Sequence, residues 1–131
     1  MIGLDTNILV RYLAQDDPVQ SAQATQIIEK QLHRQAPGFI SLVTVVETVW
    51  VLGSVYRQSD IEIAKAIEGI LAADTLTVQN EQEVFQAMIA LKTGESSFDD
   101  ALIGALGLWA GCSSTLTFDR KASRLSSFRL A

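Results

Sequence analysis

Four acidic residues far apart in the sequence are the best candidates for chemistry. Asp5 interrupts the apolar opening MIGLDTNILV, Glu47 is the only charge in FISLVTVVETVWVLGSVY, and Asp100 and Asp119 lie in FDDALIGAL and TFDR. Gathered carboxylates repel one another and raise one another's pKa values unless a cation lies among them. Oxygen ligands with no His or Cys nearby favour Mg²⁺ or Mn²⁺ over Zn²⁺. Such an ion activates water and stabilises charge on a phosphoryl group, so the pattern predicts phosphodiester hydrolysis.

Each acid also has a purely structural alternative. Asp5 and Asp119 could serve only as N-caps or dipole partners of the helices that follow them. The spacing of Asp99 from Ser96 matches a capping box, which places Asp99 outside the cluster. The next serine along would have the same spacing to Asp100, so that alternative stays open for Asp100 too.

Glu47 is the most informative acid, because a buried carboxylate needs a partner. No basic residue lies between Phe39 and Tyr56. A metal ion could neutralise Glu47. A distant arginine could do so instead, with three candidates: Arg11, Arg57 and Arg120.

The elements that must position these acids are short strands alternating with helices. We expect strands at 1–5, 38–41, 75–79, 114–118 and 128–131. We expect helices at 7–15, 18–35, from about 43, and at 60–73, 80–94, 98–111 and 119–126. This order predicts an α/β fold with a mainly parallel sheet covered by helices on both faces. Because the carboxyl ends of parallel strands share one edge, where ligands bind, the four acids are candidates for one cluster.

Composition bounds the class of protein. The 131 residues are 48% hydrophobic and 19% charged, which is typical of one folded domain over 1–131. The net charge of −5 makes the chain a poor non-specific nucleic-acid binder unless a cation neutralises its acids. The lone Cys112 is expected to be a small buried hydrophobe in a reducing cytoplasm.

Several features exclude other classes. We expect no secretory leader, because no basic and apolar signal precedes Asp5, and no membrane span, because the apolar run 39–56 is too short and too polar. His33 lies on a predicted surface helix and is expected to be solvated. Three glycines fall within a predicted helix and follow no strand, which indicates close helix packing rather than a phosphate loop: Gly104, Gly107 and Gly111.

Four motifs, taken together, resemble the PIN-domain family. They are GLDTNILV at 3–10, VVETVWVL at 45–52, FDDALIGAL at 98–106 and TFDR at 117–120. The similarity is to the VapC-type toxin ribonucleases of toxin–antitoxin pairs, and it covers the whole chain in order and spacing. It implies a three-layer α/β/α domain with a central, mainly parallel five-stranded sheet. It also implies an endoribonuclease that depends on Mg²⁺ or Mn²⁺.

The resemblance assigns roles to particular residues. It implies four catalytic and metal-holding acids, in chain order: Asp5, Glu47, Asp100 and Asp119. The role of Asp119 is the least direct, because it can act through water. Thr6 or Asn7 and the hydroxyl of Thr117 match positions that support the site.

The resemblance also implies partners. Four basic residues closely follow acidic positions and are candidates for contacts with the RNA backbone, with surface solubility as the alternative: Arg11, Arg120, Lys121 and Arg124. A homodimer and a cognate antitoxin, whose tail blocks the acidic pocket, are implied as well. Two other classes stay open, a PIN-like RNA-binding protein without turnover and a structure-specific DNA nuclease.

Overall fold

The structure is a computed structural model that describes all residues 1–131, and it divides into two compact units, 1–81 and 82–131. Each unit contains its own helices and its own hydrogen-bonded strands. That the whole chain acts as one domain therefore stays a prediction.

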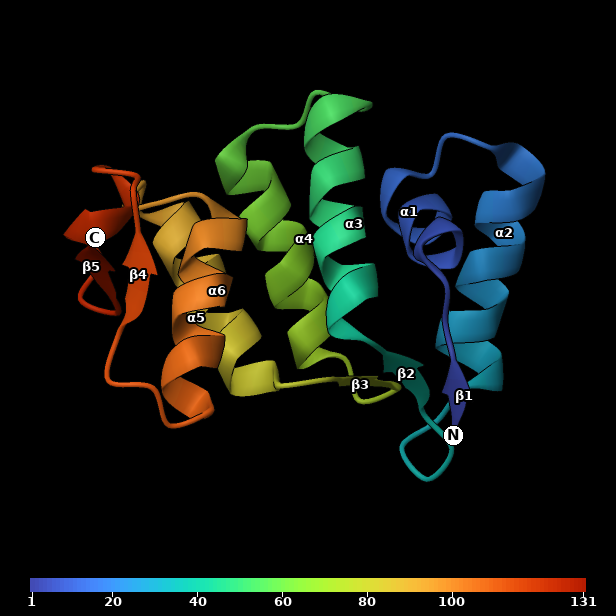
Figure 1. The fold of residues 1–131 in the computed structure, drawn as a ribbon. Coiled ribbons are helices and arrows are strands. Elements are labelled where there is room, and N and C mark those ends of the chain that lie inside the picture. Colours follow the sequence, from blue (N-terminus) through green and yellow to red (C-terminus); the bar gives the residue numbers. More distant parts are fainter. The chain divides into compact units, whose positions relative to one another are not determined.

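The first unit is built on a three-stranded parallel sheet with the order β1-β2-β3. Its strands are β1 (Ile2–Gly3), β2 (Gly38–Ile40) and β3 (Leu76–Val78). Parallel neighbours need a long crossover connection, and here each crossover is helical. Figure 1 shows the chain leaving β1 for α1 and α2 before it returns to β2.

Capping residues set where the helices of this unit begin. These helices are α1 (Thr6–Ala14), α2 (Pro18–Gln26), α3 (Leu42–Ser54) and α4 (Asp60–Ala72). Asp17 accepts hydrogen bonds from two backbone N–H groups of α2, and Pro18 occupies the first turn, where its missing N–H costs nothing. Ser59 and Glu62 form a reciprocal capping box at α4. The core of the unit includes four fully buried aliphatic side chains: Leu9, Ile28, Leu52 and Ile67.

In the second unit, two helices are followed by a pair of parallel strands. Its elements are α5 (Glu81–Lys92, which starts at the last residue of the first unit), α6 (Phe98–Trp109), β4 (Thr115–Thr117), a 3₁₀ turn (Ala122–Arg124) and β5 (Phe128–Leu130). A Cβ on Gly104 would collide with Ser127 and Phe128, and one on Gly107 would lie 2.6 Å from Thr115 Oγ1. Close packing is thus confirmed as the reason for these two glycines.

The five predicted strands are confirmed, whereas the predicted length of the second helix is wrong. All five strands exist and pair in parallel, and hydrogen bonds join three of them in the first unit and two in the second. The helix predicted over 18–35 ends in a π turn at Gln31, where Leu32 N donates to Ile27 O at 2.9 Å and the chain becomes extended.

The segment after α6 also differs from expectation. The helix ends at Trp109, so Gly111 lies outside it with a φ of 100°. This turn leaves Cys112 exposed rather than buried. The predicted helix 119–126 is reduced to the single 3₁₀ turn.

None of the helices has the length and apolar character needed to cross a membrane.

Gly104→Ala should destabilise the second unit, because the added methyl group has no room against Ser127 and Phe128. Overpacking of this kind costs about 1–3 kcal/mol in the free energy of unfolding, measurable by urea denaturation. Gly69→Ala is the matched control, since a methyl group added there, inside α4, would meet nothing within 4 Å. The control should be stabilised by about 0.5–1 kcal/mol. Equal unfolding midpoints for the two variants would contradict the packing argument.

Candidate active site

Asp5 joins the end of β1 to the beginning of α1. Its backbone is extended, and its Oδ1 accepts a hydrogen bond from Thr6 N at 2.8 Å, so Asp5 is the N-cap of the helix. The structural alternative is therefore confirmed for this residue. The cap uses only one carboxylate oxygen of Asp5, however. The other oxygen, Oδ2, has no hydrogen bond within the protein, and the side chain is exposed.

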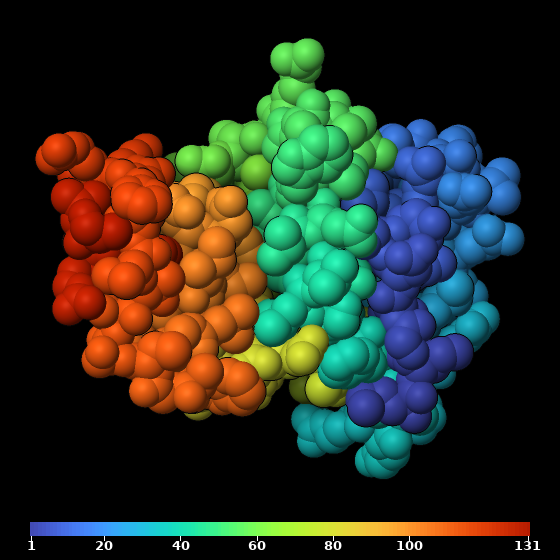
Figure 2. All heavy atoms as spheres, in the orientation of Figure 1, coloured from blue at the N-terminus to red at the C-terminus, as the bar shows by residue number.

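Thr6 links this junction to α3. Its hydroxyl donates to Glu47 Oε1 at 2.9 Å, across 41 positions of sequence. Ser41 starts α3 by accepting from Thr44 N, which places Glu47 in the second turn of the helix. Asp5 and Glu47 thus both bond to Thr6, one to its backbone and the other to its side chain. Figure 2 shows the blue α1 segment directly against the teal α3 segment.

The expectation that Glu47 is buried is wrong. Its side chain is exposed, because the buried face of α3 is formed by residues such as Val45, Thr48 and Leu52. None of the three candidate arginines forms an ion pair with it, and Arg11 is paired with Asp16 instead. The Glu47 carboxylate is therefore free to bind a cation.

Asp100 lies in the first turn of α6. Ser97 is the N-cap of this helix, and its Oγ accepts from Asp100 N at 3.3 Å. The predicted cap at Ser96 is wrong, because the buried Ser96 hydroxyl donates to Ser97 O instead. Asp99 is exposed and outside the capping pair. The half-buried Asp100 carboxylate makes no hydrogen bond or ion pair of its own.

Asp119 follows β4 and shapes the turn behind it. Its Oδ1 accepts from Lys121 N at 2.8 Å and from Ala122 N at 3.2 Å. Thr117 Oγ1 accepts from Asp119 N at 3.0 Å, so the predicted supporting hydroxyl holds the backbone of this acid. The capping alternative is confirmed here too, and again one carboxylate oxygen is left over.

The predicted basic residues fall into two kinds. Arg120, Lys121 and Arg124 are exposed and form no ion pairs, which leaves their charges available. Arg11 differs, because it is already held by other side chains. Its Nη1 donates to Asp16 at 3.2 Å and to Tyr56 Oη at 3.0 Å.

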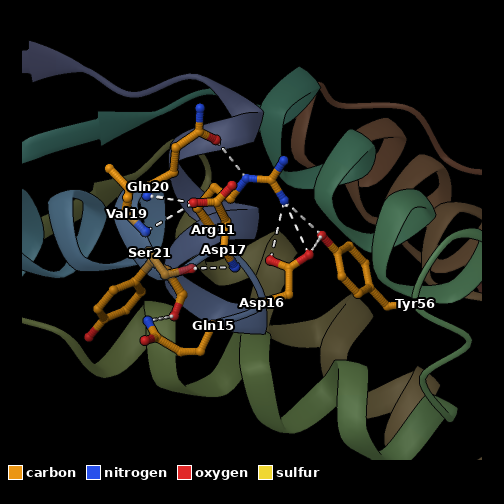
Figure 3. A network of polar contacts seen from close by, with 9 residues as sticks. Arg11, Gln15, Asp16, Asp17, Val19, Gln20, Ser21 and Tyr56 are labelled. Carbon is orange, nitrogen blue, oxygen red and sulfur yellow. Dashed lines mark hydrogen bonds and ion pairs between the residues drawn. The ribbon is translucent and has the colours of Figure 1, made fainter.

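Sequence reasoning missed this network around Arg11 (Figure 3). Arg11 Nε also donates to Gln20 Oε1 at 2.8 Å, and Tyr56 Oη donates to Asp16 Oδ2 at 2.7 Å. The hydrogen bond from Tyr56, with the charge of Arg11, lowers the pKa of Asp16 below its usual value. No pattern signals a contact between Asp16 and Tyr56, which lie 40 positions apart.

The donor chemistry of the four predicted acids fits a hard divalent ion. Each offers at least one carboxylate oxygen free of hydrogen bonds, and none of the four is paired with Lys or Arg. Oxygen donors of this kind suit Mg²⁺ or Mn²⁺. Within neither unit, however, do three or more Asp, Glu, His or Cys side chains gather as a metal site. The structure joins Asp5 and Glu47 through Thr6, and the four-acid cluster stays a prediction.

Two comparisons bear on this arrangement. The model of the PIN-domain family matches residues 2–127, which includes all four acids. A comparison with curated proteins found none that matches the chain.

Tyr56→Phe should raise the pKa of Asp16 toward its ordinary value, because the hydroxyl that donates to its carboxylate is lost. A carboxyl with a lowered pKa in the folded state stabilises the protein above its unfolded-state pKa, and that stabilisation disappears as the pH falls through the folded-state pKa. The variant should therefore lose stability at neutral pH and converge with wild type in acid. NMR titration of the Asp16 carboxyl and urea unfolding at several pH values would check this. An unchanged Asp16 titration would contradict the network.

Proposed function

Because the chain belongs to the PIN-domain family, we propose that it is a metal-dependent endoribonuclease, the toxin of a VapC-type toxin–antitoxin pair. The family fold is a three-layer α/β/α arrangement. Its members are generally nucleases that act on RNA or DNA and use divalent metal ions. The observation that carries the proposal is the pair of exposed carboxylates, Asp5 and Glu47, bonded to the same threonine.

The proposal gives the four acids distinct roles. Asp5, Glu47 and Asp100 would hold Mg²⁺ or Mn²⁺ directly, whereas Asp119, which caps a turn with one oxygen, would act through water. The chemistry supplied by a bound ion is Lewis-acid stabilisation of the phosphoryl oxygens and activation of water. No histidine base or side-chain nucleophile is then required.

Neighbouring polar groups would keep the acids in position. The Thr6 hydroxyl holds Glu47 Oε1 and leaves Oε2 for the ion. Asn7 is exposed beside it at the start of α1. The Thr117 hydroxyl fixes the backbone of Asp119. Hydrogen bonds that orient metal ligands in this way commonly contribute about 10- to 100-fold to affinity or activity.

The partners belong to the same proposal. Arg120, Lys121 and Arg124 are free cations that would contact the RNA backbone. A cognate antitoxin, a homodimer and a cytoplasmic location complete it. DNA as the substrate is the alternative to test, because both nucleic acids are cleaved within the family.

Asp5→Asn and Asp100→Asn should each lower metal-dependent RNA cleavage by at least about 100-fold, because even the loss of a group that only orients a metal ligand costs about 10- to 100-fold. Asp99→Asn is the matched control, since that exposed neighbour of Asp100 should leave the rate unchanged. Single-stranded RNA, tRNA and single-stranded DNA should be compared as substrates. Faster cleavage of DNA would refute the choice of RNA, and undiminished cleavage by Asp5→Asn would refute the site.

Thr6→Val should raise the Mg²⁺ concentration needed for half-maximal cleavage by about 10- to 100-fold, because Glu47 loses its hydrogen-bond donor. Thr6→Ser keeps the hydroxyl and should restore most of the metal affinity. Thr77→Val, at an exposed position on β3 with no side-chain hydrogen bond, should behave as wild type. If Thr6→Ser were as impaired as Thr6→Val, the hydroxyl would not be the group that matters.

A further inference from the structure

A groove along α1 and α2 is unexplained by the proposed metal site. It begins at Asn7, two residues after Asp5, and its volume is about 680 Å³. Small-molecule sites usually measure about 300–1,000 Å³, so the groove can hold a ligand of that size. The groove also reaches Arg11 on α1. At a rise of roughly 1.5 Å per residue, the six residues from Asp5 to Arg11 span about 9 Å along the helix. The lining of the groove therefore starts two residues after the first proposed catalytic acid, although Asp5 itself does not line it.

The walls of the groove are rich in side-chain amides. Five of them line it: Asn7, Gln20, Gln23, Gln26 and Gln31. The exposed side chains of Gln23, Gln26 and Gln31 make no hydrogen bond within the protein. Gln20 uses its oxygen to accept from Arg11, which leaves its NH₂ group free to donate. Each free amide offers both donors and an acceptor, the combination that matches the edge of a nucleobase.

The charge of the groove favours a neutral ligand over a phosphate. No carboxylate lines it, although the chain carries a net charge of −5. Its single cation, Arg11, is offset by Asp16 at 3.2 Å. Figure 3 shows Gln20 bonded to Nε of the guanidinium from one side and Asp16 and Tyr56 bonded to Nη1 from the other, while Nη2 has no partner. Arg11 is thus a fixed hydrogen-bond donor whose charge is largely balanced.

The remaining lining is apolar and can pack against a flat ring. It consists of Ile8, Ala22, Ala24 and Ile27, of which Ile8 and Ile27 are half-buried. Proteins recognise unpaired bases by contacts to the ring faces together with hydrogen bonds to the base edges. In this groove aliphatic side chains supply the ring contact and the amides supply the hydrogen bonds. A base within a duplex already uses its Watson–Crick edge for pairing with the opposite strand. The ligand chemistry is therefore that of an unpaired base, and the proposed ribonuclease function makes single-stranded RNA its source.

We propose that this groove is a nucleobase subsite, which binds the base of a nucleotide flanking the cleaved phosphodiester. The inference rests on the proposed ribonuclease function and adds a determinant of substrate choice to it. The amides of Gln23 and Gln31, together with Nη2 of Arg11, read the base edge, and Ile8 and Ile27 contact the ring.

The test measures RNA binding by the full chain in EDTA, so that no cleavage interferes. A short fluorescent single-stranded RNA is compared with the same strand carrying abasic nucleotides. The double variant Gln23→Ala/Gln31→Ala removes two amides from the groove, and Gln82→Ala removes an exposed amide from α5 as the matched control. Alanine favours helix at least as well as glutamine, so the variants should fold.

The double variant should bind the intact RNA about tenfold more weakly, the loss expected for two hydrogen bonds, while the control is unchanged. Wild type should prefer intact over abasic RNA by a similar factor. The slope of affinity against salt should stay the same, because neutral amides release no counterions. Equal binding of intact and abasic RNA, or unchanged affinity in the double variant, would overturn the subsite. A reduced salt slope would indicate a phosphate contact and would overturn it as well.

Metal-dependent cleavage of RNA by the same preparations separates the two proposals. If wild type cleaves RNA and the groove variants bind normally, only the subsite is wrong. If wild type neither cleaves nor binds RNA, the ribonuclease function fails and the subsite fails with it.

Discussion

The hydrogen bond from the Thr6 hydroxyl to Glu47 is the interaction on which the functional account depends. The backbone N–H of Thr6 is held by Asp5, and its side chain holds Glu47, so one residue orients two carboxylates that are distant in sequence. The arrangement follows from the fold, because β1 and β2 are parallel neighbours and each leads directly into a helix. The two helix beginnings must therefore lie close together, which brings α1 and α3 into contact.

Capping and metal binding are compatible roles for the same acid. A helix or turn that follows a strand needs an acceptor for its first N–H groups, and a carboxylate can supply one oxygen for that purpose. Asp5 and Asp119 both do so, and each keeps a second oxygen. The cap fixes the side chain in advance, which lowers the entropy cost of binding an ion. The structural explanation of these residues therefore does not weaken the catalytic one.

Local signals predicted the elements, and the parallel strand order predicted that Asp5 and Glu47 approach each other, whereas most individual contacts between distant side chains could not be predicted. Caps such as Asp17 and Ser59 marked the starts of helices, because they act within one turn. The apolar run around Glu47 suggested that this helix is buried on all sides. Val43 and Trp50 are nevertheless about 70% and 67% exposed, so α3 carries apolar side chains on its exposed face as well as on its buried face. The network around Arg11 joins side chains of α1 and α2 to side chains of the loops that follow α1 and α3, and no hydrophobic periodicity predicts such contacts.

If Asp5 and Glu47 are metal ligands, their exposed and unpaired carboxylates must bind a hard divalent ion. The most direct measurement is the binding of Mn²⁺, followed by the loss of the free-ion signal in electron paramagnetic resonance, for wild type and Glu47→Gln. Glu95→Gln removes another exposed carboxylate elsewhere and serves as the reference. Mg²⁺ should displace Mn²⁺ from wild type, and Glu47→Gln alone should weaken Mn²⁺ binding by at least about tenfold. Equal Mn²⁺ affinity in wild type and Glu47→Gln would contradict the role of Glu47 as a metal ligand.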